Sequence, residues 1–545
     1  MAATTGRPST SSGASTPTRD PEHPRSVALH GADIAGQAKR QIWHALRRRK
    51  TETLVSDESK KPKHELALVS PLRPPALPAW RIVMAMLGGS LNASFLIAGS
   101  LTIKFGGPGG SLVAYVIAVA VLYMATTSLM EVASRMPDDL PYYMYGRQIF
   151  GRAVGAALAW CYWLLWIVIL VYEIVASGFI MAFWLPDVDR AMWCVLLLIA
   201  CIIIVVLDSR LYSVVECTLT LVIICAIITS IIVGALIAAG KLGDHKYGLE
   251  TWRSDGGPFV GGVLGVIGAS IFANFAVQGA EVGAIMALKS PSRRSRRLVP
   301  LAICGAFALL LWSSTFVTGL VLPPSDPWFD KESFDSADGS AFTYIFEKAE
   351  IHPASHVVNA ILLLSALFDA CIALYISTTI LQDLAARRLA PKGLQNPTNG
   401  RKLSPYSMGV CCILTLGIWA LTFIRVESAV ALMAGVIGTS GFITWGAIAL
   451  MHCIMRWSKK HRHPADNSSN TTLASSAGIY KAPLFPLGPL FCLVHEVAII
   501  AGIIYIAAWM DFDVYVFLFG TMQIFVFIAL IGFAALIQHF GYCLC

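Results

Sequence analysis

Long apolar segments follow one another along most of this chain, and they constrain its fold more than any other feature. From Arg81 onward we count twelve of them, most of them close to the roughly 20 residues that a helix needs to cross a bilayer. Their approximate bounds are 82–103, 111–133, 154–184, 191–207, 214–239, 259–288, 299–322, 355–380, 406–424, 429–455, 485–509 and 514–538. Charged residues make up only 14% of the chain, against roughly 25% in soluble domains. The sequence therefore predicts an all-α, polytopic membrane protein with about twelve transmembrane helices.

Charge divides the chain into parts and predicts its topology. Residues 1–80 are rich in Ser, Thr, Pro and basic residues, which is typical of a disordered tail. We expect a ten-span core over 81–455, a cytosolic loop over 456–483, and spans 11 and 12 with a short C-terminus over 484–545. Loops after even-numbered spans are basic, whereas the longest loop after an odd-numbered span, 322–353, is acidic. The positive-inside rule then places both termini in the cytosol. The net charge of +8 indicates topology and not nucleic-acid binding.

The first span contains a run of small and polar residues. Between Arg81 and Phe105 it reads Gly88-Gly89-Ser90-Leu91-Asn92-Ala93-Ser94 at its centre. Two adjacent glycines cost about 1 kcal/mol each relative to alanine in a helix. Transporters break helices near the midplane to offer bare backbone groups to a substrate. A close crossing of two helices through small residues explains the same composition, and this stretch alone does not separate the two interpretations.

A second interruption lies five spans later. In span 6 the sequence Phe275-Ala276-Val277-Gln278-Gly279-Ala280 is again small and polar. Broken spans 1 and 6 are expected when two five-span repeats of inverted topology place them against each other. We therefore expect a 5+5 inverted-repeat, leucine-transporter-like core with spans 1 and 6 broken, plus two extra helices. Main-chain amides at the two breaks would be free to hold a small zwitterion or amine.

Carboxylates inside the spans are candidates for function, because an ionisable group in a span costs at least a few kcal/mol. Glu173, Glu281 and Asp369 lie well within spans 3, 6 and 8, where we favour a role in lining a polar cavity and coupling to protons over a structural hydrogen bond. Glu131 closes span 2, where a salt bridge at the helix end is an equal interpretation. Glu216 opens span 5 beside the interface, so solvation explains it.

Motifs in the same order over several hundred residues resemble the fungal amino acid permeases of the amino acid–polyamine–organocation superfamily, of which the chain looks like a divergent member. The matching pieces run from span 1 to the segment before span 11: Leu87-Gly88-Gly89, Gly106-Gly107-Pro108-Gly109-Gly110, Tyr162-Trp163-Leu164-Leu165-Trp166, Tyr172-Glu173, Gly279 with Glu281, Ser440-Gly441-Phe442-Ile443-Thr444-Trp445, and Pro483-Leu484-Phe485-Pro486-Leu487-Gly488-Pro489. Spans 11 and 12 fit in length only.

The resemblance implies a site between spans 1, 3, 6 and 8. It places the substrate carboxylate at Ser90, Leu91, Asn92, Ala93 and Ser94, and the amine and side chain at Phe275, Ala276, Gln278 and Gly279. The chain departs from the family pattern there: Leu91-Asn92-Ala93-Ser94 replaces I-G-T-G, and span 8 loses a basic residue and gains Asp369. We therefore expect a site of altered charge that favours a cationic or amine-rich substrate.

The resulting hypothesis is a secondary active permease that moves an amino acid or related amine, with protons, across the plasma membrane or an internal membrane such as that of the vacuole. The degraded motifs also allow a transport-defective nutrient sensor of the same fold, or a transporter of another metabolite. A major-facilitator exporter is excluded, because its G-x-x-x-D-R motif and long 6–7 loop are missing. We find no nucleophile–base pair, and the 13 cysteines lack paired metal spacing, so we expect no enzyme, cofactor or metal. The sequence leaves open the substrate, the coupling ion, the direction of transport and the oligomeric state.

Overall fold

The computed structural model describes a helical protein from residue 79 onward. The described residues are 79–88, 93–136, 140–206, 209–243, 245–253, 257–288, 292–330, 340–395, 403–423, 429–458, 480–509 and 514–543, and they contain no strand. The predicted N-terminal tail up to residue 78 and most of the predicted 456–483 loop lie outside these ranges. The structure therefore concerns the membrane part of the chain.

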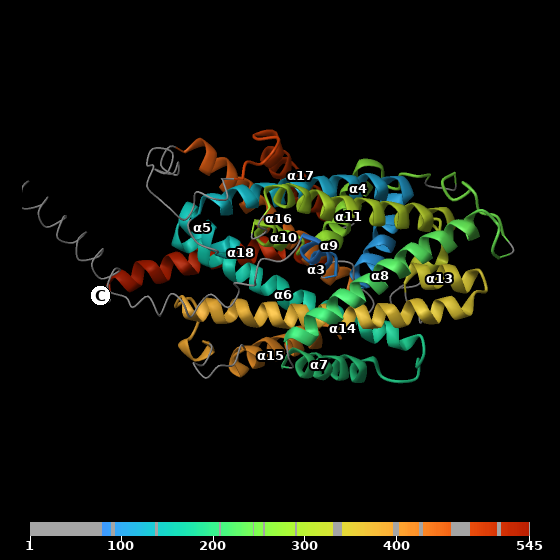
Figure 1. Cartoon of the computed structure of the whole chain (residues 1–545), viewed down its shortest axis with the longest axis horizontal. Helices are drawn as coiled ribbons and strands as arrows, with labels where there is room; N and C mark the ends of the chain where they lie inside the picture. Colours follow the sequence, from blue (N-terminus) through green and yellow to red (C-terminus); the bar gives the residue numbers. More distant parts are fainter. Residues whose placement is uncertain are drawn as a thin grey trace, which may run out of the picture. The chain divides into compact units, whose positions relative to one another are not determined.

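Each predicted span coincides with one helix or with parts of two (Figure 1). The helices are α3 (Ala79–Gly88), α4 (Ala93–Arg135), α5 (Tyr142–Phe150), α6 (Arg152–Ala182), α7 (Arg190–Val206), α8 (Ser209–Ala238), α9 (Gly262–Val277), α10 (Val282–Leu288), α11 (Arg293–Val321), α12 (Pro327–Asp330), α13 (Ala341–Lys348), α14 (His352–Ala386), α15 (Pro405–Thr422), α16 (Ala429–Trp457), α17 (Leu487–Trp509) and α18 (Val514–Cys543), with a 3₁₀ turn at Lys392–Leu394. Within the described residues, 8 helices are long and apolar enough to cross a membrane, and 9 if the bent pair α9 and α10 counts as one span. The prediction of an all-α polytopic fold is confirmed.

A sharp turn within α4 joins spans 1 and 2. Gly107 has φ 71° and ψ 174°, which interrupts the helix just before Pro108. The amides of Gly109 and Gly110 donate hydrogen bonds to the Pro258 carbonyl at 2.7 and 3.1 Å. A side chain at Gly107 would lie 2.8 Å from that same carbonyl oxygen, so only glycine allows this approach. The glycine-rich loop thereby fastens the C-terminal end of span 1 to the segment that leads into span 6.

Span 6 is broken, as the sequence predicts. α9 ends at Val277, α10 begins at Val282, and the two helices are bent by 43°. Gly279 sits between them with φ 89°, a conformation that side-chain-bearing residues rarely adopt. In span 1, α3 ends at Gly88 and α4 begins at Ala93, while residues 89–92 lie outside the described residues. The break in span 6 is consistent with the 5+5 inverted repeat, for which a broken span 1 is also expected.

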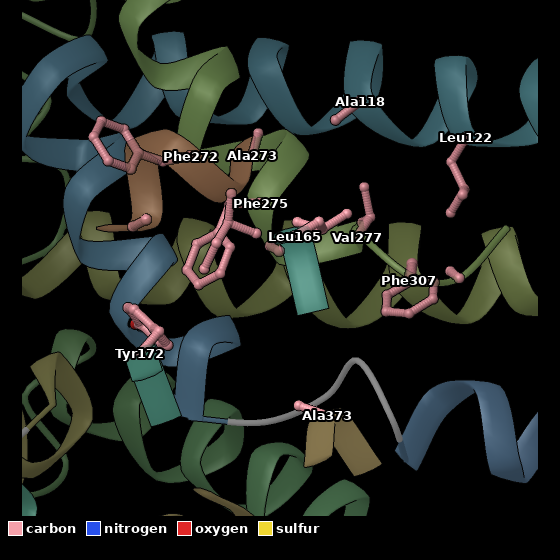
Figure 2. Close-up of a cluster of buried hydrophobic side chains, with 14 of the residues drawn as sticks. Ala118, Leu122, Leu165, Tyr172, Phe272, Ala273, Phe275, Val277, Phe307 and Ala373 are labelled. Atoms are coloured by element: carbon pink, nitrogen blue, oxygen red, sulfur yellow. The ribbon is translucent and has the colours of Figure 1, made fainter. Parts of the chain in front are cut away.

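The core of the bundle is formed by side chains of α4, α6, α9, α11 and α14. Figure 2 shows Phe272 and Phe275 of α9 together with Leu165 and Tyr172 of α6 and Phe307 of α11, all of them buried. The outer helices instead expose large apolar side chains: Ile203 of α7, Ile232 of α8 and Ile413 of α15. Exposed apolar faces of this kind suit contact with lipid, because the hydrocarbon of a bilayer is as apolar as the side chains themselves. The functional candidates therefore lie within the α4–α6–α9–α14 interior.

Candidate functional site

Glu281 closes the break in span 6. Its Oε2 accepts a hydrogen bond from the Gly279 amide at 3.0 Å and lies 3.4 Å from the indole Nε1 of Trp445, which donates to it. The Tyr162 hydroxyl donates to Oε1 at 3.4 Å. Because Tyr162 belongs to α6 and Trp445 to α16, the carboxylate joins the break to two other helices. The amide of Gly279, expected to be free for a ligand, is therefore occupied by a carboxylate of the protein itself.

Aromatic rings surround the same break. A Cβ at Gly279 would lie 3.4 Å from Cη2 of Trp166, so the indole of that residue packs directly on the backbone of the break. The ring of Phe275, in the last turn of α9, meets the ring of Tyr172 edge-on with centroids 4.9 Å apart (Figure 2). Both rings are buried. These contacts place α6 against the end of α9.

Gln278 adds an amide to the break. Its side chain is buried, and neither its oxygen nor its nitrogen has a hydrogen-bond partner within the described residues. Asn274, one turn earlier on α9, is in the same state. Burying an amide without a partner costs free energy, so each amide is available to a ligand or to water.

Glu173 and Asp369 form a pair of buried carboxyl groups, next to the contact between Tyr172 and Phe275. Glu173 of α6 is 0% exposed, and neither of its oxygens has a hydrogen-bond partner in the described part of the chain. Asp369, 5% exposed on the neighbouring helix α14, acts on Glu173 through electrostatic repulsion. Two like charges so placed in a low-dielectric interior are costly. The pair is therefore suited to hold a proton or a cationic group.

Glu131 has the opposite surroundings. It is fully buried near the end of α4, but Arg135 and Arg456 approach its carboxylate at 2.8 and 2.6 Å. A carboxylate between two guanidinium groups remains charged and bound. Of the two interpretations of Glu131, the structure supports the salt bridge at the helix end.

The structure describes only part of the predicted site. Ser90, Leu91 and Asn92 lie outside the described residues, and Ala93 and Ser94 open α4 without described side chains. The second half of the predicted site is brought together at the break of span 6 and comprises Phe275, Ala276, Gln278, Gly279 and Glu281. Glu173 and Asp369 belong to α6 and α14, which lie side by side (Figure 1), and the two carboxyl groups interact electrostatically.

Sequence reasoning missed three buried polar residues. Asn274 directly precedes the small and polar stretch that begins at Phe275 in span 6, and His495 and Glu496 lie within span 11. His495 and Glu496 are 8% and 3% exposed, with Nδ1 and Oε1 3.5 Å apart. The rule that an ionisable group in a span is a functional candidate applies to Glu496 as much as to Glu173, and it would have found this residue.

The family model and the similar sequences agree on one family. The model of the family described as amino acid permease matches residues 81–542. The lysine-specific permease LysP of Escherichia coli is 28% identical over 431 residues, which cover 78% of this chain and 86% of that protein. LysP of Lactococcus lactis is 29% identical over 440 residues, covering 78% and 83%. The general amino-acid permease GAP2 of Candida albicans is 26% identical over 412 residues, covering 73% and 68%.

Proposed function

The chain belongs to the amino acid permease family, whose model matches residues 81–542, and from this premise we propose that it transports a cationic amino acid or related amine together with protons. Membership confirms the resemblance seen in the motifs, and it makes the chain a multi-pass membrane transporter and not an enzyme. The cationic substrate, the proton and the residues that bind them are proposals.

The Glu173–Asp369 pair is the observation that carries the proposal. Electrostatic repulsion between the two carboxyl groups would be relieved by a proton held within the pair or by a cation bound beside it. A carrier that exchanges one for the other couples proton movement to the movement of a cationic substrate. The names of two relatives, both lysine-specific permeases, support a substrate with a positively charged side chain.

The breaks of spans 1 and 6 are the proposed binding elements for the amino acid group. Residues Ser90 to Ser94 would receive the α-carboxylate through backbone amides and the side chains of Asn92 and Ser94. The end of α9 from Phe275 to Gly279 would contact the amine and the first part of the side chain. The unpartnered amide of Gln278 within the described residues supports this assignment, because a polar ligand group would satisfy it.

Import across the plasma membrane, with both termini in the cytosol, completes the proposal. The basic residues in loops after even-numbered spans support this orientation. A proton gradient directed into the cell would then drive uptake.

Uptake in whole cells tests the proposal. A strain lacking its own basic amino acid permeases would express the chain, and accumulation of radiolabelled lysine, arginine, leucine and glutamate would be measured at two external pH values. We expect lysine and arginine to accumulate more than leucine and glutamate, and faster at the lower pH. Preferred uptake of glutamate, or uptake independent of external pH and of a protonophore, would contradict the proposal. Binding of lysine without accumulation would instead identify a sensor.

A further inference from the structure

Glu131 is the common acceptor for donors from three separate segments. Arg135 Nη2, on the same helix, lies 2.8 Å from Oε1. From α16, Arg456 Nη2 donates to Oε2 at 2.7 Å and His452 Nε2 lies 3.2 Å from Oε2. From the segment before α17, the Ala482 amide donates to Oε2 at 2.8 Å. One buried carboxylate thus joins the cytosolic ends of spans 2 and 10 to the approach to span 11.

The segment 480–486, called here the strap, and the start of α17 run antiparallel to α4. Four contacts pair successive residues of the strap and α17 with successively earlier residues of α4: the Tyr480 carbonyl with Ser134 Oγ at 3.4 Å, the Ala482 amide with Glu131 at 2.8 Å, the Gly488 Cβ position with Met124 Sδ at 3.0 Å, and Cys492 Sγ with the Val121 carbonyl at 3.6 Å. Strap and helix therefore share a continuous interface, and Glu131 lies within it.

Phe485 of the strap covers the charged group. The Arg456 guanidinium lies 4.7 Å from the centre of its ring, and the His452 ring lies 5.0 Å from it. His452 Nδ1 is 3.0 Å from the Ser128 hydroxyl. The Phe485 ring covers part of the ion pair, in which the Glu131 carboxylate is fully buried and the Arg456 side chain is 25% exposed.

We propose that Glu131 is a positioning residue that makes the cytosolic half of α4, the end of α16 and the strap with α17 one rigid unit, which moves as a whole during transport. Separating a buried carboxylate from its cations leaves uncompensated charges and is strongly unfavourable. Span 11, which lies outside the inverted repeat, then takes part in the transport movement because it is attached to span 2. The inference does not depend on which substrate the chain carries.

Crosslinking across the interface tests whether it stays closed during transport. Ser134→Cys combined with Tyr480→Cys places two thiols where α4 meets the strap, and each single substitution serves as a control for pairing with native cysteines. The probe is a radiolabelled mixture of the proteinogenic L-amino acids. We expect the oxidised, crosslinked protein to retain its uptake. Loss of uptake on oxidation that a reductant restores would overturn the proposal, and so would failure of the two thiols to crosslink.

A second measurement needs no substrate and remains informative if the proposed function is wrong. Arg456→Met removes an inter-helix contact to Glu131, whereas the control Arg135→Met removes a contact within one helix. In the detergent-purified protein we expect Arg456→Met and Glu131→Gln to lower the melting temperature by about 5 °C or more relative to Arg135→Met. Equal melting temperatures for Arg456→Met and Arg135→Met would show that Glu131 does not join the segments.

Discussion

Glu281 Oε2 accepts a hydrogen bond from the Gly279 amide at 3.0 Å, so a side chain two residues further along closes the break in span 6. The same carboxylate accepts from Tyr162 of α6 and Trp445 of α16. The geometry of the break therefore depends on one carboxylate held by three neutral donors. Glu281 is then a structural part of the binding region, whether or not it also carries a proton.

Glu281→Ala removes the acceptor for all three donors and should lower the initial rate of amino acid uptake about 100-fold, because hydrogen bonds to a charged group contribute about 1.5–3 kcal/mol each. Glu281→Gln keeps one carbonyl acceptor, so its initial rate of uptake should fall only about tenfold. Uptake would be normalised to surface expression. Glu250→Gln, at an exposed glutamate, is the matched control and should behave as wild type. Wild-type uptake by Glu281→Ala would refute this role.

Gly279→Ala should reduce both stability and uptake. The residue has φ 89°, and a side chain in such a left-handed conformation costs roughly 1–2 kcal/mol. The new methyl group would lie 3.4 Å from the Trp166 ring, an ordinary contact, so the backbone strain accounts for the expected loss. Gly305→Ala on α11, where a Cβ meets nothing within 4 Å, should leave the melting temperature and uptake unchanged.

The position of the spans and of the break in span 6 could be predicted from the sequence, because both depend on local composition. Gly279 and the apolar segments around it indicate a broken span without reference to any other helix. The pairing of Glu173 with Asp369 could not be predicted, since it arises from the packing of α6 on α14. Likewise, nothing in the sequence around Glu281 shows that Tyr162 and Trp445 donate to it. These contacts join residues more than a hundred positions apart.

The structure describes the half of the candidate site that lies in span 6 but not the half that lies in span 1. The span 6 half is described, and there the prediction of free backbone amides needs revision at Gly279, whose amide is already bound. The span 1 half at Ser90 to Ser94 stays a prediction. His495 and Glu496 were missed because only the spans of the inverted repeat were searched for buried charges. The same rule, applied to span 11, identifies them.

The surroundings of Glu347, in the segment between spans 7 and 8, predict that the stability of the protein depends on pH. Partial burial acts to raise the pKa of this carboxyl on α13, but hydrogen bonds from Ser355 and His352 outweigh it, and the pKa is lowered. Because the pKa is lower in the folded state, the contact stabilises the protein at pH values above the ordinary glutamate pKa of about 4.3. This stabilisation is lost as the pH falls through the folded-state pKa.

Glu347→Gln should therefore melt at a lower temperature than wild type at neutral pH, and the difference should disappear below about pH 4. Melting curves of the purified protein across this range provide the measurement. Glu250→Gln, which changes an exposed glutamate, should show no such convergence. A difference that grows as the pH falls would mean that the sign of the pKa shift is wrong.

The buried carboxyl pair makes the sharpest prediction about coupling. Asp369→Asn removes the repulsion on Glu173, and the pair loses one of the two carboxyl groups that would attract a cation. We expect Asp369→Asn and Glu173→Gln each to reduce lysine uptake about tenfold or more, because one charge interaction in the interior is worth more than 1.4 kcal/mol. Leucine uptake, if measurable, should change less, since leucine carries no side-chain charge.

The double variant Glu173→Gln with Asp369→Asn should also lose the rise in uptake at low external pH, because no carboxyl group of the pair remains to take up a proton. Glu496→Gln is the matched control, since it neutralises a buried carboxyl on α17 outside the proposed site. It should keep both the pH dependence and the preference for lysine. The opposite result, in which Glu496→Gln abolished the pH dependence and the double variant kept it, would mean that Glu496 in span 11 binds the proton. The pair between α6 and α14 would then be assigned to substrate binding alone.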